Sequence, residues 1–183
     1  VGRSGRDGLP ALSVLLPYMG KDGQKSDLDT AFGLVNKSIL GVDKLLVRWY
    51  SMVQNPSTYL EGDRMIVDLS TVPTSFSPED AQYAGVRNMM WNVNALLLLH
   101  REHYIDIQGA RFIPEKNTYS FTCRLLDTET LMEEEKLRQA LEPDRQREYD
   151  MRVYGYRQMA DLVHKPRVRC WARRLTALFP LAE

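Results

Sequence analysis

The sequence predicts an α+β fold that is mainly helical, and three observations support this class. Residues 42–54 carry apolar side chains at the spacing of a helix with one buried face. The segment Ser77–Asp80 has the composition of a helix start, with a Ser cap, a Pro at the first position and acidic residues in the first turn. Residues 104–107 and 118–123 alternate apolar and polar side chains, as the strands of an antiparallel pair do.

The 183 residues have the composition of an ordinary globular protein, with 44% hydrophobic and 26% charged residues. Lys and Arg number 24, as do Asp and Glu, and this balance excludes a uniformly basic scaffold. The longest apolar run, Ala95–Leu99, is far shorter than the ~20 residues of a membrane span. The polar amino terminus does not resemble a secretory signal, and two cysteines cannot form a disulfide framework. We therefore expect a cytoplasmic protein, nucleoid-associated if bacterial, without membrane contact.

The first half of the chain predicts a strand, two helices and a second strand. Residues 11–18 are mostly apolar, as in a short buried strand, and a polar turn segment follows over 20–26. Asp27 or Asp29 can then cap a helix that runs to about Leu40. The next helix, over about 42–54, ends at Asn55-Pro56, and residues 64–69 predict a strand. The apolar residues of that helix that share one face are Leu45, Leu46, Trp49, Met52 and Val53.

The middle of the chain predicts a long helix followed by two paired strands. The helix should run from Ser77 to about Glu102, and the polar connection at 114–117 should be the turn between the strands. Its expected buried stripe consists of Val86, Met90, Val93 and Leu97. The polar residues expected to lie away from that stripe are Arg87, Asn88 and Asn92.

The last third of the chain predicts three helices. A charged helix is expected over 128–140, and Pro143 should open another that runs to about Val163. A third is expected after Pro166, through Phe179. Residues 164–174 contain five Lys or Arg and no acidic residue, so the zero net charge conceals a basic end.

The residues with the clearest chemistry stand at the amino terminus, where Gly2, Arg3, Gly5 and Arg6 form a glycine-rich loop. Glycines let the backbone turn sharply and approach a nucleotide closely. Two arginines three positions apart on such a loop can both reach one phosphate cluster. A guanidinium makes forked contacts to phosphate oxygens, which a lysine cannot copy. The pattern therefore indicates phosphate binding.

This motif resembles motif VI of superfamily 2 helicases. Its continuation through Asp7–Ala11 into an apolar strand is most similar to RecQ-like ATP-dependent DNA helicases. The resemblance implies that Arg6 is an arginine finger for the γ-phosphate, a role that contributes ~10³–10⁵ in turnover. Arg3 would be its phosphate-side partner, and Gly2 and Gly5 would complete the ATP contacts.

The sequence lacks the other half of such an ATPase. No Gly-x-x-x-x-Gly-Lys-Ser/Thr phosphate loop and no Asp-Glu-x-His magnesium motif occurs in it. The chain opens within a motif and without a methionine, so we expect a fragment whose partner is the upstream helicase lobe. ATP and Mg²⁺ would belong to the parent protein. The isolated chain should bind no cofactor and be inactive.

Residues 77–126 resemble the end of a winged helix, a long helix followed by a two-stranded wing, and RecQ-like helicases carry such a module for duplex DNA. The resemblance is one of pattern, and a plain packing unit with a solvated helix face explains it equally well. Contacts of this kind would go to the DNA backbone and weaken steeply with salt. The candidate contacts are Arg87, Asn88, Asn92 and Arg101 on the helix and Arg111 and Lys116 on the wing.

The basic carboxyl-terminal stretch suits a nucleic-acid backbone together with one stacking surface. Its candidate contacts are Arg167, Arg169, Trp171, Arg173 and Arg174. The stretch also resembles the start of the RecQ zinc-binding region, which implies that Cys170 is a first Zn²⁺ ligand in the parent. Two departures stand against this: the arginines at 173 and 174 do not follow Cys170 immediately, and a structural zinc site needs four ligands.

Together these expectations divide the chain into four parts. Residues 1–26 would be the edge of a second RecA-like lobe, 27–76 a helical connector, 77–126 a winged-helix-like module, and 127–183 a helical region leading into a possible zinc-binding segment. The implied function is part of a 3′–5′ ATP-dependent DNA helicase acting on single-stranded or forked duplex DNA. The alternatives are a non-enzymatic winged-helix DNA-binding module or regulator, and a helical interaction domain without a nucleic-acid role.

Overall fold

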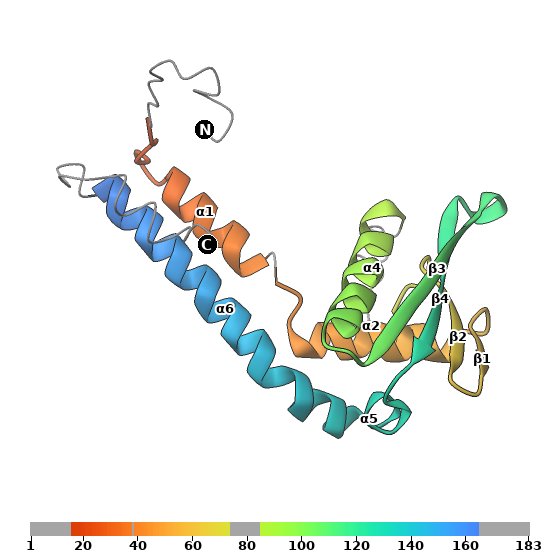
Figure 1. The fold of residues 1–183 in the computed structure, drawn as a ribbon. Helices are drawn as coiled ribbons and strands as arrows, with labels where there is room; N and C mark the ends of the chain where they lie inside the picture. Colours follow the sequence, from red (N-terminus) through yellow and green to blue (C-terminus); the bar gives the residue numbers. More distant parts are fainter. Residues whose placement is uncertain (1–15, 38, 74–84, 165–183) are drawn as a thin grey trace, which may run out of the picture. The chain divides into compact units, whose positions relative to one another are not determined.

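The computed structural model describes residues 16–37, 39–73 and 85–164 (Figure 1). Residues 11–15 of the strand predicted over 11–18 lie outside these residues, and residues 16–18 form no strand. The predicted helix start at Ser77 lies wholly outside them. The chain forms two compact units, residues 1–38 with 149–183 (unit 1) and residues 39–148 (unit 2). The described residues are mainly helical with one small antiparallel sheet, which confirms the predicted α+β class.

Helix α2 (Val42–Gln54) lies at the centre of the core of unit 2. It has the predicted bounds and ends where Asn55 and Pro56 interrupt the helical pattern. Its apolar face buries Leu45, Leu46 and Trp49 completely or nearly so. The Trp49 indole N–H donates to the carbonyl of Leu131, at 2.9 Å, so the largest core side chain also satisfies its polar atom.

The sheet has four antiparallel strands in the order β1-β2-β4-β3. They are β1 (Tyr59–Glu61), β2 (Arg64–Asp68), β3 (Ile105–Ile113) and β4 (Thr118–Leu125). Met65 of β2 pairs with Cys123 of β4, and both are fully buried. A 3-10 turn, η1 (Pro114–Lys116), joins β3 to β4, and a bulge between Ile107 and Gly109 bends β3. The β3–β4 hairpin extends past the pairing with β2 (Figure 1).

This topology corrects the predicted division at residues 76 and 77. β2 belongs to the segment expected to be a helical connector, yet it pairs along its whole length with β4. The wing strands therefore belong to a sheet that begins earlier in the chain, and both sides of the predicted boundary lie in unit 2. Strand β1 was not predicted, because three residues are too few to show an alternating pattern.

Helix α4 (Val86–Arg101) buries the face opposite to the one expected. Val86, Met90 and Leu97 of the predicted buried stripe are 70%, 49% and 48% exposed, and its fourth member, Val93, is partly buried against the core. The residues that α4 does bury are Asn88, Asn92, Ala95, Leu96, Leu98 and Leu99. The expectation failed because a burial pattern based on hydrophobicity places amides outside, whereas here other elements supply their hydrogen-bond partners.

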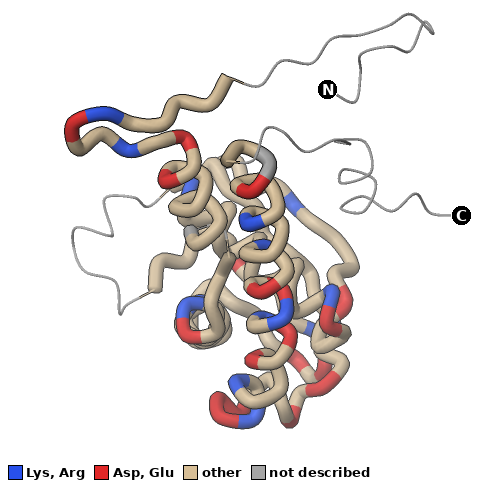
Figure 2. The backbone as a smooth tube through the Cα atoms, turned by 90° about the vertical axis from the view of Figure 1, so that its left-hand side faces the viewer, with Lys and Arg blue, Asp and Glu red and all other residues tan. Residues whose placement is uncertain are grey.

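Two helices were expected between 128 and 163, and the structure divides this region differently. Helix α5 (Thr128–Met132) is a short turn capped by Asp127, whose side chain accepts from the Thr130 amide. Helix α6 (Glu134–His164) then runs without a break through Pro143. Proline removes one helical hydrogen bond, but the turns around it are fixed by burial of Leu137, Leu141 and Arg145. Acidic and basic positions are interspersed along α6 (Figure 2).

In unit 1, helix α1 (Asp27–Lys37) lies against the carboxyl-terminal half of α6. The rings of Phe32 and Tyr156 are 5.1 Å apart, and the Tyr149 hydroxyl donates to Asn36. The cap of α1 is Ser26 rather than either predicted aspartate. The Ser26 hydroxyl accepts from the Asp29 amide and the Asp29 carboxylate accepts from the Ser26 amide, which is the reciprocal arrangement of a capping box.

A candidate nucleic-acid interface at the β3–β4 hairpin

The outer end of the β3–β4 hairpin presents an aromatic pair and a cation. Phe112 and Tyr119 face each other across the two strands, with ring centroids 5.1 Å apart, and each is 44% exposed. Arg111 precedes Phe112 and is also exposed. Successive side chains on a strand point to opposite sides, so the hairpin carries its aromatic pair on one side and its guanidinium on the other.

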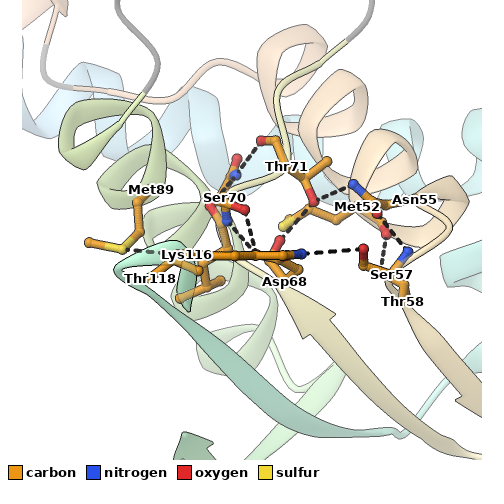
Figure 3. Close-up of polar contacts among 12 residues, drawn as sticks. Met52, Asn55, Ser57, Thr58, Asp68, Ser70, Thr71, Met89, Lys116 and Thr118 are labelled. Carbon is orange, nitrogen blue, oxygen red and sulfur yellow. Dashed lines mark hydrogen bonds and ion pairs between the residues drawn. The ribbon is translucent and has the colours of Figure 1, made fainter. Parts of the chain in front are cut away.

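Lys116, the second predicted wing residue, is held by the protein itself. Its Nζ lies 2.7 Å from Oδ2 of Asp68, at the end of β2, and 3.5 Å from the Ser57 hydroxyl (Figure 3). The side chain of Asp68 is only 5% exposed, whereas that of Lys116 is half exposed. A cation within hydrogen-bond distance of a buried carboxylate adds little net charge to the surface, so Lys116 is a weaker phosphate ligand than expected.

The Asp68 carboxylate has further donors in the loop that follows β2. Oδ1 accepts from the amide of Ser70, at 2.9 Å, and from its hydroxyl, at 2.7 Å. Burial raises the pKa of Asp68, but the hydrogen bonds from Lys116 and Ser70, with the charge of Lys116, outweigh it and hold that pKa below its usual value. Asp68 is therefore ionised at neutral pH, and its charge is neutralised by Lys116.

Asn88 and Asn92 are structural residues, which corrects their assignment as DNA contacts. Both are buried, and Nη1 of Arg48 donates to the side-chain oxygen of each at 2.8 Å. The Asn88 amide donates to the Thr71 carbonyl, and the Asn92 amide donates to the carbonyls of Leu69 and Thr71, at 2.8–2.9 Å. Their polar atoms are used inside unit 2 and do not face a ligand.

These contacts converge on residues 68–71 and form what we call the strand-end network. Its remaining link is Asn55, whose amide donates to the Thr71 hydroxyl, while that hydroxyl donates to the Asp68 carbonyl (Figure 3). The members of the network are Arg48, Asn55, Asp68, Ser70, Thr71, Asn88, Asn92 and Lys116. It joins α2, α4, the end of β2 and the hairpin turn.

Sequence reasoning missed Arg48 and Asp68, and only Arg48 gives a signal in the sequence. Arg48 lies on the apolar face of α2, beside Leu45 and Met52 in helical spacing, and it is buried there. A charge within an apolar stripe indicates a buried partner, because an unpaired buried charge is costly. Burial lowers the pKa of Arg48, and its two asparagine acceptors compensate for part of the lost hydration.

The remaining cations predicted on α4 differ in their surroundings. The Arg101 guanidinium lies 2.9 Å from Glu102 and 3.1 Å from Glu148, so it joins the end of α4 to α6. Glu148 also binds the buried Arg145, at 2.7 Å. Arg87 is exposed in the first turn of α4. The structure thus places Arg111 and an aromatic pair on opposite sides of one hairpin, while Arg101 is engaged in ion pairs elsewhere.

The nucleotide motif and the basic stretch lie outside the described residues. This holds for Gly2, Arg3, Gly5 and Arg6, for Arg167, Arg169, Trp171, Arg173 and Arg174, and for the predicted zinc ligand Cys170. Cys123 is buried within the sheet, where burial, together with the charge of Asp106, raises the pKa of its thiol to about 12. Within residues 16–37, 39–73 and 85–164, no three His, Cys, Asp or Glu side chains are grouped so that they could hold a metal ion.

Comparison of the chain with protein-family models, with curated proteins and with solved structures finds no match in any of the three. Among the helices that the structure describes, none combines the length and apolar character needed to cross a membrane.

Proposed function

We propose that the chain supplies a winged-helix-like DNA-binding module and the motif VI edge of a RecA-like lobe in a RecQ-like ATP-dependent DNA helicase. The observation that supports the DNA-binding part is the succession of α4, β3 and β4. A long helix leads directly into a two-stranded hairpin whose outer end carries Arg111, Phe112 and Tyr119 in exposed positions. This is the pattern that the sequence resemblance implies for a wing.

The chemistry of the hairpin favours binding without sequence readout. An aromatic face accepts any base, and stacking of this kind contributes about 1–3 kcal/mol per base. Arg111 can neutralise a phosphate, which adds affinity and salt dependence but no base recognition. A single-stranded or forked DNA suits the hairpin better than an intact duplex, because its bases are free to stack on Phe112 and Tyr119.

The helicase part of the proposal rests on residues 2–8. By the resemblance, Arg6 acts as the finger for the γ-phosphate and Arg3 as its partner, while ATP and Mg²⁺ are held mainly by an upstream lobe. Movement along the strand would be 3′ to 5′. Zn²⁺ binding by Cys170 belongs to the same proposal and needs three further ligands.

A non-enzymatic winged-helix DNA-binding module or regulator is the second candidate, and the same hairpin supports it. The two differ in what they require of Arg6. In a helicase, replacing this residue removes ATP turnover and spares DNA binding. In a regulator, no ATP turnover depends on it.

A fluorescence anisotropy titration tests the DNA-binding part. The chain is added to a labelled single strand, a forked duplex and a blunt duplex at several salt concentrations. We expect the fork and the single strand to bind more tightly than the duplex, with affinity falling linearly in log–log form as salt rises. Failure to bind any of the three in a salt-dependent manner would remove both DNA-binding candidates.

The helicase part needs a second experiment in the parent protein. Arg6→Ala should lower ATP turnover by about a thousandfold or more, with unchanged affinity for the forked DNA. Arg111→Met is the matched control, since it removes an arginine from the proposed DNA surface and should leave turnover without DNA unchanged. Normal turnover in Arg6→Ala would contradict the finger assignment while leaving the DNA-binding proposal intact.

A further inference from the structure

We propose that Lys116 is a positioning residue that fixes the β3–β4 hairpin for nucleic acid, and that it does not itself bind a phosphate. This inference rests on the proposed DNA-binding role of the hairpin. Lys116 lies in the hairpin turn, and its ammonium group donates a hydrogen bond to Asp68, which stands 48 residues earlier in the sequence. It thus connects the part of unit 2 proposed to meet DNA with the buried strand-end network.

The Asp68 side of this pair is fixed from several directions. Ser70 donates two hydrogen bonds to the carboxylate, and the Thr71 hydroxyl donates to the Asp68 carbonyl. Thr71 in turn accepts from Asn88 and Asn92 through its backbone oxygen. Because Asp68 is buried and paired with β4, its carboxylate has little freedom to follow Lys116 if the hairpin moves.

Two other contacts hold the same end of the hairpin. The backbone amide of Leu69 donates to the Tyr119 carbonyl at 3.0 Å, and the Thr118 hydroxyl lies 3.6 Å from the sulfur of Met89 (Figure 3). The first is an ordinary backbone bond and the second a weak contact to sulfur. The pair of Lys116 with Asp68 is the charged member of this group, and charge-assisted hydrogen bonds are about twice as strong as neutral ones.

The position of Lys116 makes it effective for this purpose. It lies three residues before Tyr119 and four after Phe112, in the turn that joins the strands of the aromatic pair. A small rotation of the turn would displace both rings and Arg111 together. A phosphate that drew Lys116 away from Asp68 would leave a carboxylate that is 5% exposed without its cation.

Variants of the full chain separate the positioning role from a phosphate contact. Each lysine or arginine that neutralises a phosphate contributes to the slope of log affinity against log salt, so removing one lowers that slope by about 1. We therefore compare Lys116→Met with Arg111→Met, the matched loss of one charge from the same hairpin. Two further variants complete the set. Lys116→Arg keeps a cation for Asp68, and Asp68→Asn with Lys116→Met removes the pair without leaving an unpaired buried charge.

We expect Arg111→Met to lower the salt slope by about 1, as a phosphate contact should. Lys116→Met should weaken binding of forked DNA by about tenfold at one salt concentration while leaving the slope unchanged. Lys116→Arg should bind as the unaltered chain does, because it keeps a cation for Asp68. The double variant lacks the pair, so it should bind as weakly as Lys116→Met, again with an unchanged slope. Amide hydrogen exchange across 111–119 should rise on the order of tenfold both in Lys116→Met and in the double variant.

The possible contrary results point to different errors. If Lys116→Met lowers the slope as Arg111→Met does, Lys116 is a phosphate ligand and the positioning role is wrong. If its affinity and hairpin exchange are both unchanged, the role is also wrong. If Lys116→Met does not fold, the double variant decides, because full affinity in a chain without the pair overturns the role. A chain that binds DNA in none of its forms overturns the proposed function itself, and the DNA role of Lys116 falls with it.

Discussion

At the end of β2, charged and amide side chains are buried, whereas around α5 and the start of α6 they lie in water. Arg48, Asn88 and Asn92 are each less than a tenth exposed and share their hydrogen bonds. Lys136, by contrast, forms ion pairs with Glu129 and Glu133 at 2.6 and 2.8 Å, and all three side chains are largely exposed. Hydrogen bonds and ion pairs of similar length therefore contribute differently to stability in the two regions. Water can replace a lost partner around Lys136, but it cannot do so in the buried network at the end of β2.

The largest effect is expected from Asn92→Ala in the buried region. The change leaves the carbonyls of Leu69 and Thr71 short of a donor and Arg48 short of an acceptor. We expect a loss of about 2–4 kcal/mol in the free energy of unfolding, because buried polar groups left without partners bear their full desolvation cost. Chemical denaturation measures this loss.

Asn94→Ala is the matched control, since it makes the same change on an exposed position of the same helix. Its effect should stay within about 0.5 kcal/mol. Similar losses in the two variants would show that the network does not distinguish the faces of α4.

Asp68 provides a test through pH. Its folded pKa lies below the unfolded value, so its stabilising contribution is present above the unfolded pKa and is lost as pH falls through the folded pKa. Asp68→Asn should cost about 2 kcal/mol at pH 7, through the lost charge-assisted hydrogen bonds. The cost should shrink as pH falls below about 4, the ordinary value for an aspartate. Thermal unfolding of both proteins from pH 7 to pH 3 gives the comparison, and a pH-independent difference would argue against an ionised Asp68.

Trp49→Phe should have a smaller effect. Phenylalanine keeps most of the apolar volume but cannot donate to the Leu131 carbonyl, which is then left without the indole N–H. We expect a loss of about 1–2 kcal/mol, measured by denaturation. A loss beyond about 4 kcal/mol would indicate that packing volume, and not the hydrogen bond, decides this position.

The smallest effect is expected in the exposed region, at Lys136. Hydrogen bonds to Glu129 and then to Glu133 raise the pKa of its ammonium group, but the site is open to water and its ion pairs are screened by salt. Lys136→Met should leave the unfolding midpoint nearly unchanged in about 0.5 M salt, roughly three times the physiological ionic strength. A clearly lower unfolding midpoint at that concentration would mean that water does not replace the partners of Lys136. The two regions would then not differ as we infer.

The helices α2 and α4 show what could be predicted from the sequence. The bounds and buried face of α2 follow from its pattern, because its apolar residues lie on one side. α4 has apolar residues on both sides, and the side that carries Asn88 and Asn92 is the buried one. Their partners lie at positions 69 and 71, so the choice depends on tertiary contacts that local spacing does not reveal.

The candidate site was predicted with similar limits. The alternating pattern predicted the β3–β4 hairpin, and it placed Arg111 on that hairpin as an exposed cation. The sequence analysis also assigned Lys116 to DNA contact, because nothing around a lysine in a polar turn indicates a buried aspartate 48 residues earlier as its partner. The aromatic pair was not proposed, since Phe112 and Tyr119 become neighbours only through the register of the hairpin. The helicase motif at residues 2–8 stays a prediction.

The sulfur of Cys123 has a practical consequence for studies of this chain. It lies in β4, one of the two inner strands of the sheet, where it is fully buried and burial keeps the thiol protonated. An alkylating reagent can reach it only when unit 2 opens, since reaction requires an accessible thiolate. In a Cys170→Ser background Cys123 is the sole thiol of the sequence, so its rate of labelling would report how often unit 2 opens.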